Sequence, residues 1–168
     1  VAAERIRDEL IRMLESPRPS LGLWPMYNTG VLELVIPELA SCAGTPQEGG
    51  EVTDLLEHLI LACDAAPPVN TAVRLAALLH DVGKPQSMTE DEAGVIHFHG
   101  HDAVSAKMSE EILTRLRVPN KTIRYVSRLI AAHMRQYQQD WPDAAVRRFV
   151  HRVGADAVWD LISLQRAD

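Results

Sequence analysis

An apolar stretch that runs into adjacent histidine and aspartate constrains this chain more than any other feature. Residues 75–79 read LAALL and residues 80–85 read HDVGKP. Good helix formers with apolar side chains around most of the circumference predict a buried helix, which Gly83 and Pro85 should end through a left-handed turn. His80 and Asp81 are therefore expected on the last turn of a core helix, where a buried charge needs a partner or a metal ion. For the dipeptide alone, a hydrogen-bonded pair at a helix end stays open.

Length and composition indicate a globular chain. At 168 residues, with 46% hydrophobic and 24% charged residues, it fits one domain, or one domain with a small appendage. No apolar run approaches the length of a membrane span, and the N-terminus lacks the apolar core of a signal peptide. Cys42 and Cys63 have neither metal-type spacing nor the number for a disulfide framework, which predicts a cytoplasmic location.

Charge is distributed unevenly along the chain. No Lys or Arg occurs between residues 19 and 73, whereas the basic region from Arg115 to Arg152 holds nine of them against Asp140 and Asp143. A charge run usually forms only a solvated face, so RNA or tRNA contact through this region is the secondary interpretation. The tryptophans Trp24, Trp141 and Trp159 are expected to be packing residues rather than platforms for base stacking.

Periodicity and turn residues predict an all-α bundle with one small inserted β-hairpin. The linker-like residues 44–50, GTPQEGG, predict a domain boundary there. Ser20 and Asn70 are expected to cap the helices that follow them. Helices are expected over residues 2–15, 21–27, 52–65, 71–81, 100–117, 119–133, 142–153 and 155–168, a helix or turn over 31–36, and the hairpin over 87–99.

Four further residues fall on apolar stripes of other predicted helices. Each is expected to point inward, toward the level at which His80 and Asp81 end their helix. One buried histidine with a hydrogen-bond partner is common, whereas a convergent set is not. The four are His58 with Leu55 and Ala62, His101 with Val104 and Met108, His133 with Val126 and Ile130, and Asp168 with Leu161 and Leu164.

Imidazoles and carboxylates in one cluster are the ligand types of a transition-metal site. Mixed sets of this kind suit Mn, Fe, Co, Ni or Zn, and a carboxylate can bridge two ions. Two such ions can clamp a phosphoryl group and lower the pKa of a bound water, which gives hydroxide near neutral pH. The sequence therefore predicts one or two divalent ions, with Mg²⁺ as a further candidate.

The order of these residues resembles a known family. His58, then His80-Asp81, then a distant Asp168 is similar to the pattern of the HD superfamily of metal-dependent phosphohydrolases. Residues 4–10, 36–39, 65–68, 75–85 and 100–101 resemble the C-terminal half of bacterial tRNA nucleotidyltransferase and poly(A) polymerase family proteins. In those proteins a nucleotidyltransferase head and a helical RNA-binding neck precede an HD domain. The resemblance implies the end of a neck over residues 1–45 and an HD domain over residues 46–168, without the Gly-Ser loop and paired aspartates of the polymerising head.

The resemblance also implies a role for each matching residue. The four signature ligand positions are matched by His58, His80, Asp81 and Asp168. His101 and His133 match positions that hold a second ion in histidine-rich members, with Asp81 as the bridge. Lys84 matches a lysine that neutralises phosphate charge, so Asp81 and Lys84 are the expected catalytic residues.

The hairpin histidines His97 and His99 alternate on one side of their strand, next to the expected site. They are candidates for binding substrate or ion, and a solvated hairpin is an equal alternative. His151 is expected to be exposed.

The expected function is metal-dependent hydrolysis of phosphate esters, as phosphomonoesterase or phosphodiesterase on nucleotides or RNA ends. The alternative is a non-catalytic RNA- or tRNA-binding module with a structural metal site. A structural site is coordinatively closed, whereas a hydrolase needs an open, water-bearing position beside Lys84.

Overall fold

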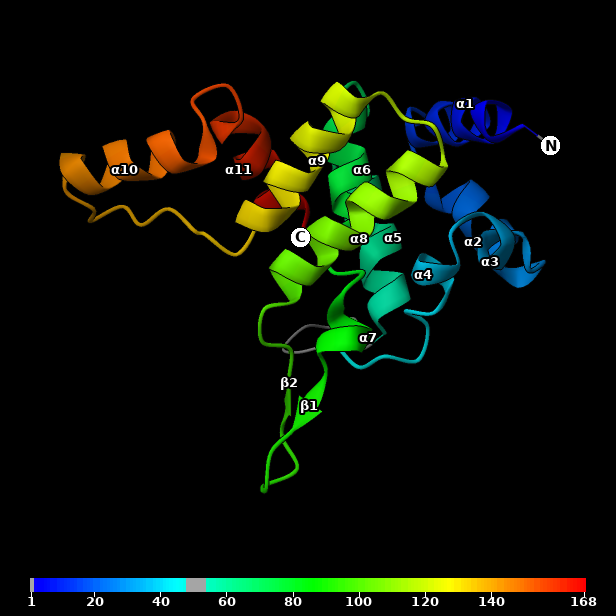
Figure 1. Cartoon of the computed structure of the whole chain (residues 1–168), viewed down its shortest axis with the longest axis horizontal. Helices are drawn as coiled ribbons and strands as arrows, with labels where there is room; N and C mark the ends of the chain where they lie inside the picture. The colour runs from blue at the N-terminus through cyan, green and yellow to red at the C-terminus, as the bar shows by residue number, and fades with distance from the viewer. Residues whose placement is uncertain (1, 48–53) are drawn as a thin grey trace.

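The computed structural model describes residues 2–47 and 54–168, and the predicted all-α bundle with a small hairpin is confirmed (Figure 1). The elements are α1 (Ala3–Leu14), α2 (Ser20–Asn28), α3 (Val31–Val35), α4 (Pro37–Ala40), α5 (Leu55–Ala65), α6 (Thr71–Leu79), α7 (Lys84–Ser87), β1 (Thr89–Glu90), β2 (Ile96–His97), α8 (His101–Arg115), α9 (Asn120–Ala132), α10 (Asp143–Val153) and α11 (Val158–Ala167). None of the described helices combines the length and the apolar character that a membrane crossing requires.

Helix α6 lies at the centre of the bundle. Every residue from Val73 to Leu79 is buried, and the helix packs against α1, α5, α9 and α11 (Figure 1). As predicted, Asn70 caps α6, because its side chain accepts a hydrogen bond from the backbone N–H of Val73. Because other helices surround α6, the residues that follow Leu79 also lie in the interior.

The end of α6 differs from the sequence prediction in two respects. The helix ends at Leu79, so His80 and Asp81 lie in the turn after it, and α7 begins at once with Pro85 in its first turn. Gly83 has φ −84°, which is not left-handed. Glycine is needed there for space, because a Cβ would lie 2.7 Å from the backbone nitrogen of Ser105 and 2.9 Å from its hydroxyl.

The hairpin is antiparallel and projects from the lower end of the bundle (Figure 1). Thr89 pairs with His97, and Glu90 pairs with Ile96. It is shorter than expected, because Ser87 belongs to α7. This register places His97 at the base of the hairpin.

Helices α1–α4 share one continuous hydrophobic core with the rest of the chain. Their buried leucines pack together with those of α5 and α6. Ser20 does not cap α2: it lies inside the helix, and its hydroxyl donates to Asp64 of α5 over 2.6 Å. Residues 48–50 of the expected linker and the expected helix start at Val52 lie outside the described residues. Asp54 caps α5 at Leu55, and the boundary near residue 45 stays a prediction.

The tryptophan prediction holds only in part. Trp24 and Trp141 pack against the core, whereas Trp159 is 77% exposed on α11. A single exposed apolar side chain of this kind is ordinary for a protein surface.

Arg74 of α6 forms hydrogen bonds inside the core to the C-terminal ends of α1 and α5. It is buried, and its guanidinium donates to the carbonyl oxygens of Ala66 at 2.9 Å and of Leu14 and Ser16 at 2.7 Å each. These carbonyls lie at the C-terminal ends of α5 and α1, where the helix dipole favours a cation. The buried charge is therefore satisfied by backbone oxygens instead of a carboxylate.

We expect Arg74→Met to lower the free energy of unfolding by at least about 3 kcal/mol, because each hydrogen bond to a charged group contributes roughly 1.5–3 kcal/mol. Urea unfolding followed by circular dichroism measures this loss. The control is Thr71→Ala, which removes an exposed hydrogen bond from α6 to Glu15 of the same junction. Equal losses for the two variants would contradict a special role for Arg74.

Candidate metal centre

Six side chains predicted from helical stripes and from the His-Asp dipeptide meet at the C-terminal end of α6. They come from the first turn of α5, the turn after α6, the start of α8, and the residues that follow α9 and α11 (Figure 1). Four of the six lie at the first residue of a helix or directly after its last residue, and these helix ends surround one common space. The six residues are His58, His80, Asp81, His101, His133 and Asp168.

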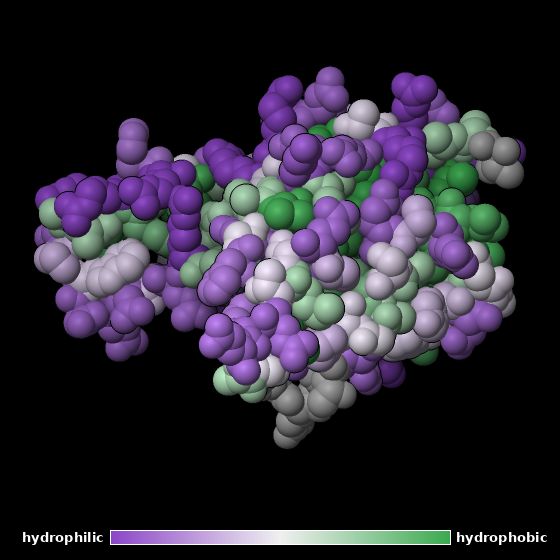
Figure 2. All heavy atoms as spheres, turned by 60° about the horizontal axis from the view of Figure 1, so that its bottom comes forward, coloured by the Kyte–Doolittle hydropathy of each residue, from purple (hydrophilic) through white to green (hydrophobic). Residues whose placement is uncertain are grey.

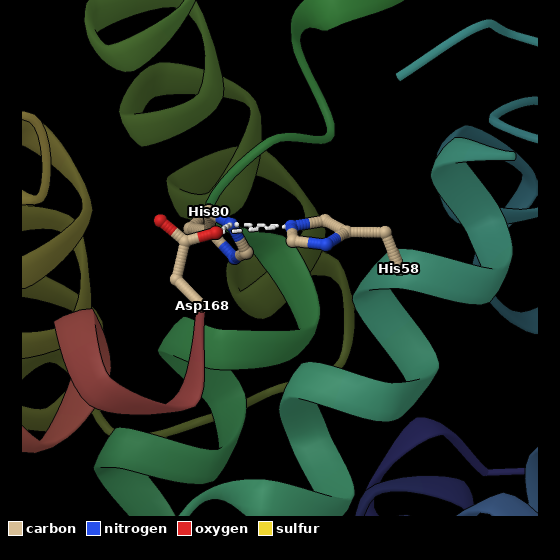
Figure 3. A group of neighbouring side chains, drawn as sticks. All are labelled: His58, His80 and Asp168. Carbon is tan, nitrogen blue, oxygen red and sulfur yellow. Dashed lines mark hydrogen bonds and ion pairs between the residues drawn. The ribbon is translucent and has the colours of Figure 1, made fainter. Parts of the chain in front are cut away.

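His58, His80 and Asp168 form the first group (Figure 3). Asp168 Oδ1 lies 3.1 Å from Nε2 of both His58 and His80, and the two Nε2 atoms are 3.2 Å apart. Asp81 Oδ2 lies 3.5 Å from His80 Nε2 and 3.8 Å from His58 Nε2. Atoms bound to one ion at about 2.0–2.2 Å are separated by roughly 2.8–3.6 Å at octahedral or tetrahedral angles. The distances among His58, His80 and Asp168 and from His80 to Asp81 are those of a ligand set, whereas Asp81 lies somewhat farther from His58.

The other oxygen of Asp81 faces a second group. Asp81 Oδ1 lies 3.1 Å from His101 Nε2 and 3.4 Å from His133 Nε2. The two oxygens of one buried carboxylate thus face different imidazoles, and His80, Asp81 and His133 also lie close enough together to hold one ion. This is the arrangement that a bridging carboxylate requires.

Three of the histidines are oriented by the same backbone contact. In each, Nδ1 lies within hydrogen-bond distance of the carbonyl oxygen three residues earlier, and Nε2 points into the centre. In the neutral imidazole this contact places the proton on Nδ1 and leaves Nε2 free as a ligand. The pairs are His80 with Ala77 at 2.8 Å, His101 with Phe98 at 2.8 Å, and His133 with Ile130 at 2.6 Å.

Two buried atoms at the centre lack a hydrogen bond to any described residue. Asp81 Oδ1 and His101 Nε2 are 3.1 Å apart, yet neither forms a hydrogen bond of regular geometry within residues 2–47 and 54–168. Buried polar atoms almost always have partners. A divalent cation would satisfy both, so the donor set and its orphaned atoms fit a metal ion.

The charges of the centre stabilise each other. Burial would raise the pKa of Asp81, but the charge of His80 in its protonated form, the contacts with His101 and His133 and the Lys84 ammonium hold that pKa well below its usual range. Burial would lower the pKa of His80, but Asp81 and Asp168 raise it. Asp81 is therefore an anion at any physiological pH, as a metal ligand must be.

Lys84 lies against the centre on the side of the loop before α5. Its Nζ is 2.7 Å from Asp81 Oδ2, donates to Gln47 Oε1 at 2.7 Å, and lies 5.4 Å from the centroid of the Phe98 ring. Gln47 is absent from the sequence predictions, because a polar residue in a linker has no periodicity that would single it out. Gln47 holds the ammonium in place, and the phosphate-binding role of Lys84 stays a prediction.

The centre opens into a cavity of about 260 Å³. Lys84, His97, His99, Met134 and Asp168 are among its lining residues. His97 Nε2 lies 2.9 Å from Asp91 Oδ2, and the rings of His97 and His99 are stacked with centroids 5.3 Å apart. Both hairpin histidines therefore lie beside the centre, whereas His151 is exposed on α10 as expected.

An all-α bundle in which one histidine, a His-Asp pair and a distant aspartate converge defines an HD-type metal-binding domain. Residues 51–163 match the family model of the HD domain, so the chain belongs to the HD domain family. Residues 1–42 match the family described as the probable RNA and SrmB-binding site of polymerase A. HD domains bind divalent metals, and the cluster described above is the part of this chain that fits one.

The relatives place this HD domain among tRNA nucleotidyltransferase-family proteins. The chain is 41% identical to an A-adding tRNA nucleotidyltransferase of Deinococcus radiodurans and 37% identical to a CC-adding tRNA nucleotidyltransferase of Thermus thermophilus, over 99% of this chain and 39% of each relative. A multifunctional CCA protein of Cupriavidus necator is 32% identical over 90% of this chain and 38% of the relative. The chain thus spans about two fifths of the length of the curated relatives that it matches.

Proposed function

We propose that this chain is a metal-dependent phosphohydrolase that cleaves phosphate esters of nucleotides or of RNA ends. The observation that carries this proposal is the position of Asp81. Its two oxygens face two groups of imidazoles, and the same centre opens into a cavity walled by Lys84. A structural site would be closed by its ligands, so the open side favours catalysis.

The ligand assignment follows the two groups. His58, His80, Asp81 and Asp168 would hold one ion, and His101 and His133 would hold a second one with Asp81 between them. When bound, a divalent metal supplies Lewis-acid polarisation of a phosphoryl oxygen and lowers the pKa of water. Mn, Fe, Co, Ni and Zn suit these donors best.

The remaining residues would act on the substrate. Lys84 carries a positive charge at the cavity wall, where it would contact the phosphoryl oxygens that become more negative as the ester bond breaks. His97 and His99 lie on the hairpin at the mouth, where they would contact the phosphate or the sugar. The cavity of about 260 Å³ is smaller than the roughly 300–1,000 Å³ of sites for drug-sized ligands, which suits one ester group and its sugar.

The test is metal analysis and activity of protein purified without chelator. We expect at least one bound transition ion, hydrolysis of bis-p-nitrophenyl phosphate, loss of activity after EDTA treatment, and recovery when the ion is returned. Ligand at about 100 times its dissociation constant stabilises a fold by roughly 2.7 kcal/mol. For a chain of 168 residues this corresponds to a rise in Tm of about 5–10 °C.

The control for metal binding is His151→Asn, which changes an exposed histidine on α10 and should retain the ion and the rise in Tm. His80→Asn should lose both. A full complement of bound metal with no turnover of mono- or diesters would contradict the hydrolase and favour the second candidate function.

The second candidate is an RNA-binding module whose metal only stabilises the fold. The match of residues 1–42 to an RNA-binding family supports it. In either case we propose that residues 1–45 are the end of a neck, residues 46–168 are the HD domain, and a nucleotidyltransferase head accompanies them in the whole protein. A cytoplasmic location is part of the same proposal.

A further inference from the structure

A second cavity, of about 510 Å³, borders the metal centre. Its walls are the segment after α9 and one side of α10, and Met134 lines both this cavity and the one over the metal centre. We call it the α10 groove and define it by Arg135, Trp141, Arg148, Phe149 and Arg152. The two cavities therefore adjoin at Met134.

The arginines of the α10 groove have no acidic partners among the described residues. Arg135, Arg148 and Arg152 are exposed, and none forms an ion pair within the part of the chain that the structure describes. Two other arginines of the basic region are neutralised: Arg115 forms a two-pronged contact with Glu38, and Arg128 pairs with Asp156. Among the residues that the structure describes, three arginines of the groove thus have no acidic partner.

Aromatic side chains form the floor between these arginines. Trp141 is half-buried, and its ring packs edge-on against Phe149 with centroids 5.7 Å apart and against Tyr137 at 5.8 Å. In Figure 2 the lobe formed by α10, at the left, has strongly hydrophilic residues beside a hydrophobic strip. Trp141 packs against the core but stays partly exposed in the groove, so it has a packing role and can also offer part of its ring to a base, while the neighbouring arginines pair with phosphates.

We propose that the α10 groove binds the nucleotides next to the reacting end of a single-stranded RNA, so that the substrate is an oligonucleotide end and not a free mononucleotide. This inference rests on the proposed function, which supplies the reaction at the RNA end, namely hydrolysis of a phosphate ester. The groove holds the chain, and the cavity over the metal centre holds the terminal phosphate ester.

One side chain ties the groove to the metal centre. Gln165 of α11 donates to the carbonyl oxygens of His133 at 2.8 Å and Arg135 at 3.0 Å. The residue three positions later is Asp168, at the metal centre. The wall of the groove and two of the proposed ligands are therefore fixed to one helix, which holds the spacing between a bound chain and the reaction site.

The direct test is binding of a fluorescein-labelled single-stranded hexaribonucleotide, measured by anisotropy. We compare the wild type, the triple variant Arg135→Gln/Arg148→Gln/Arg152→Gln, and the control Arg147→Gln. Arg147 belongs to the same helix but lines a different surface hollow with Val146, Val150 and His151. We expect the triple variant to lose at least about tenfold in affinity and to reduce the salt dependence of log Kd by about 2, since each single-strand phosphate contact contributes roughly 0.7.

The outcomes separate this inference from the proposed function. Unchanged affinity and salt dependence in the triple variant, or an equal loss in Arg147→Gln, would overturn the groove. Displacement of the RNA by poly-glutamate at equal charge concentration would also overturn it, because the groove would then bind any polyanion and have no selectivity for RNA. Groove-dependent binding without any phosphoester hydrolysis would remove the hydrolase and leave the groove intact. If hydrolysis is present, the ratio of kcat/KM for the oligonucleotide to that for bis-p-nitrophenyl phosphate should fall in the triple variant.

Discussion

Replacing Asp81 with asparagine is expected to lower kcat/KM for phosphoester hydrolysis by about 10³-fold or more, because a metal's charge stabilisation is worth several kcal/mol and each 1.4 kcal/mol is about tenfold. Asparagine has nearly the same shape but only one acceptor oxygen. Its amide NH₂ would face either the group of His58 and His80 or that of His101 and His133. Neither arrangement leaves an anionic oxygen for both groups.

The measurement is steady-state turnover of bis-p-nitrophenyl phosphate after reconstitution with the ion found in the wild type, beside bound-metal analysis. The control is Asp156→Asn. It removes an aspartate that lies 2.7 Å from a cation, Arg128, just as Asp81 lies 2.7 Å from Lys84, but at the surface. Asp156→Asn should keep full activity. Full activity in reconstituted Asp81→Asn would rule out hydrolysis at this centre.

Helical stripes predict most of what positions the site. His101 and Met108 share a buried face of α8, and His133 follows the buried residues Val126 and Ile130 of α9. A period of 3.6 residues fixes which side of a helix faces the core, so the amino-acid pattern alone identifies inward-pointing histidines. Periodicity does not reveal at which height of the bundle the inward-pointing histidines of different helices meet. Here the His-Asp dipeptide at the end of α6 indicates that height.

The features that the sequence does not reveal depend on contacts between distant segments. The sequence predicts a left-handed turn at Gly83, but the position requires glycine because the backbone of Ser105 leaves no room for a Cβ. Gln47, whose side-chain oxygen accepts a hydrogen bond from Lys84, 37 positions away in the chain, has no local signature either. The pairing of Arg115 with Glu38, and the lack of a described acidic partner at Arg148, decide which part of the basic region is free to bind an anion. Tertiary packing sets each of these features, and no window of sequence contains both partners.

Lys84→Met separates the catalytic role of the lysine from a purely structural one. The structure places its ammonium against Asp81 and Gln47, so a structural interpretation is that Lys84 only neutralises the buried carboxylate. In that case its removal should leave turnover unchanged or favour metal binding, because a cation that repels the ion is gone. If Lys84 is catalytic, the variant keeps its metal and loses about 10²-fold in kcat/KM, the usual effect of removing one electrostatic stabiliser.

Methionine retains an unbranched apolar stem of similar length and removes the ammonium that lies over the Phe98 ring, so the side chain still fills its space while the charge is lost. Gln47→Ala is the matched variant: it removes the hydrogen bond that holds the ammonium but leaves the charge, and should cost activity far less than Lys84→Met. Bound metal, Tm and kcat/KM measured on the three proteins decide between the two roles. Unaltered turnover in a metal-loaded Lys84→Met would show that the ammonium serves only Asp81, because a group that stabilises the reacting phosphate cannot be removed without slowing the reaction.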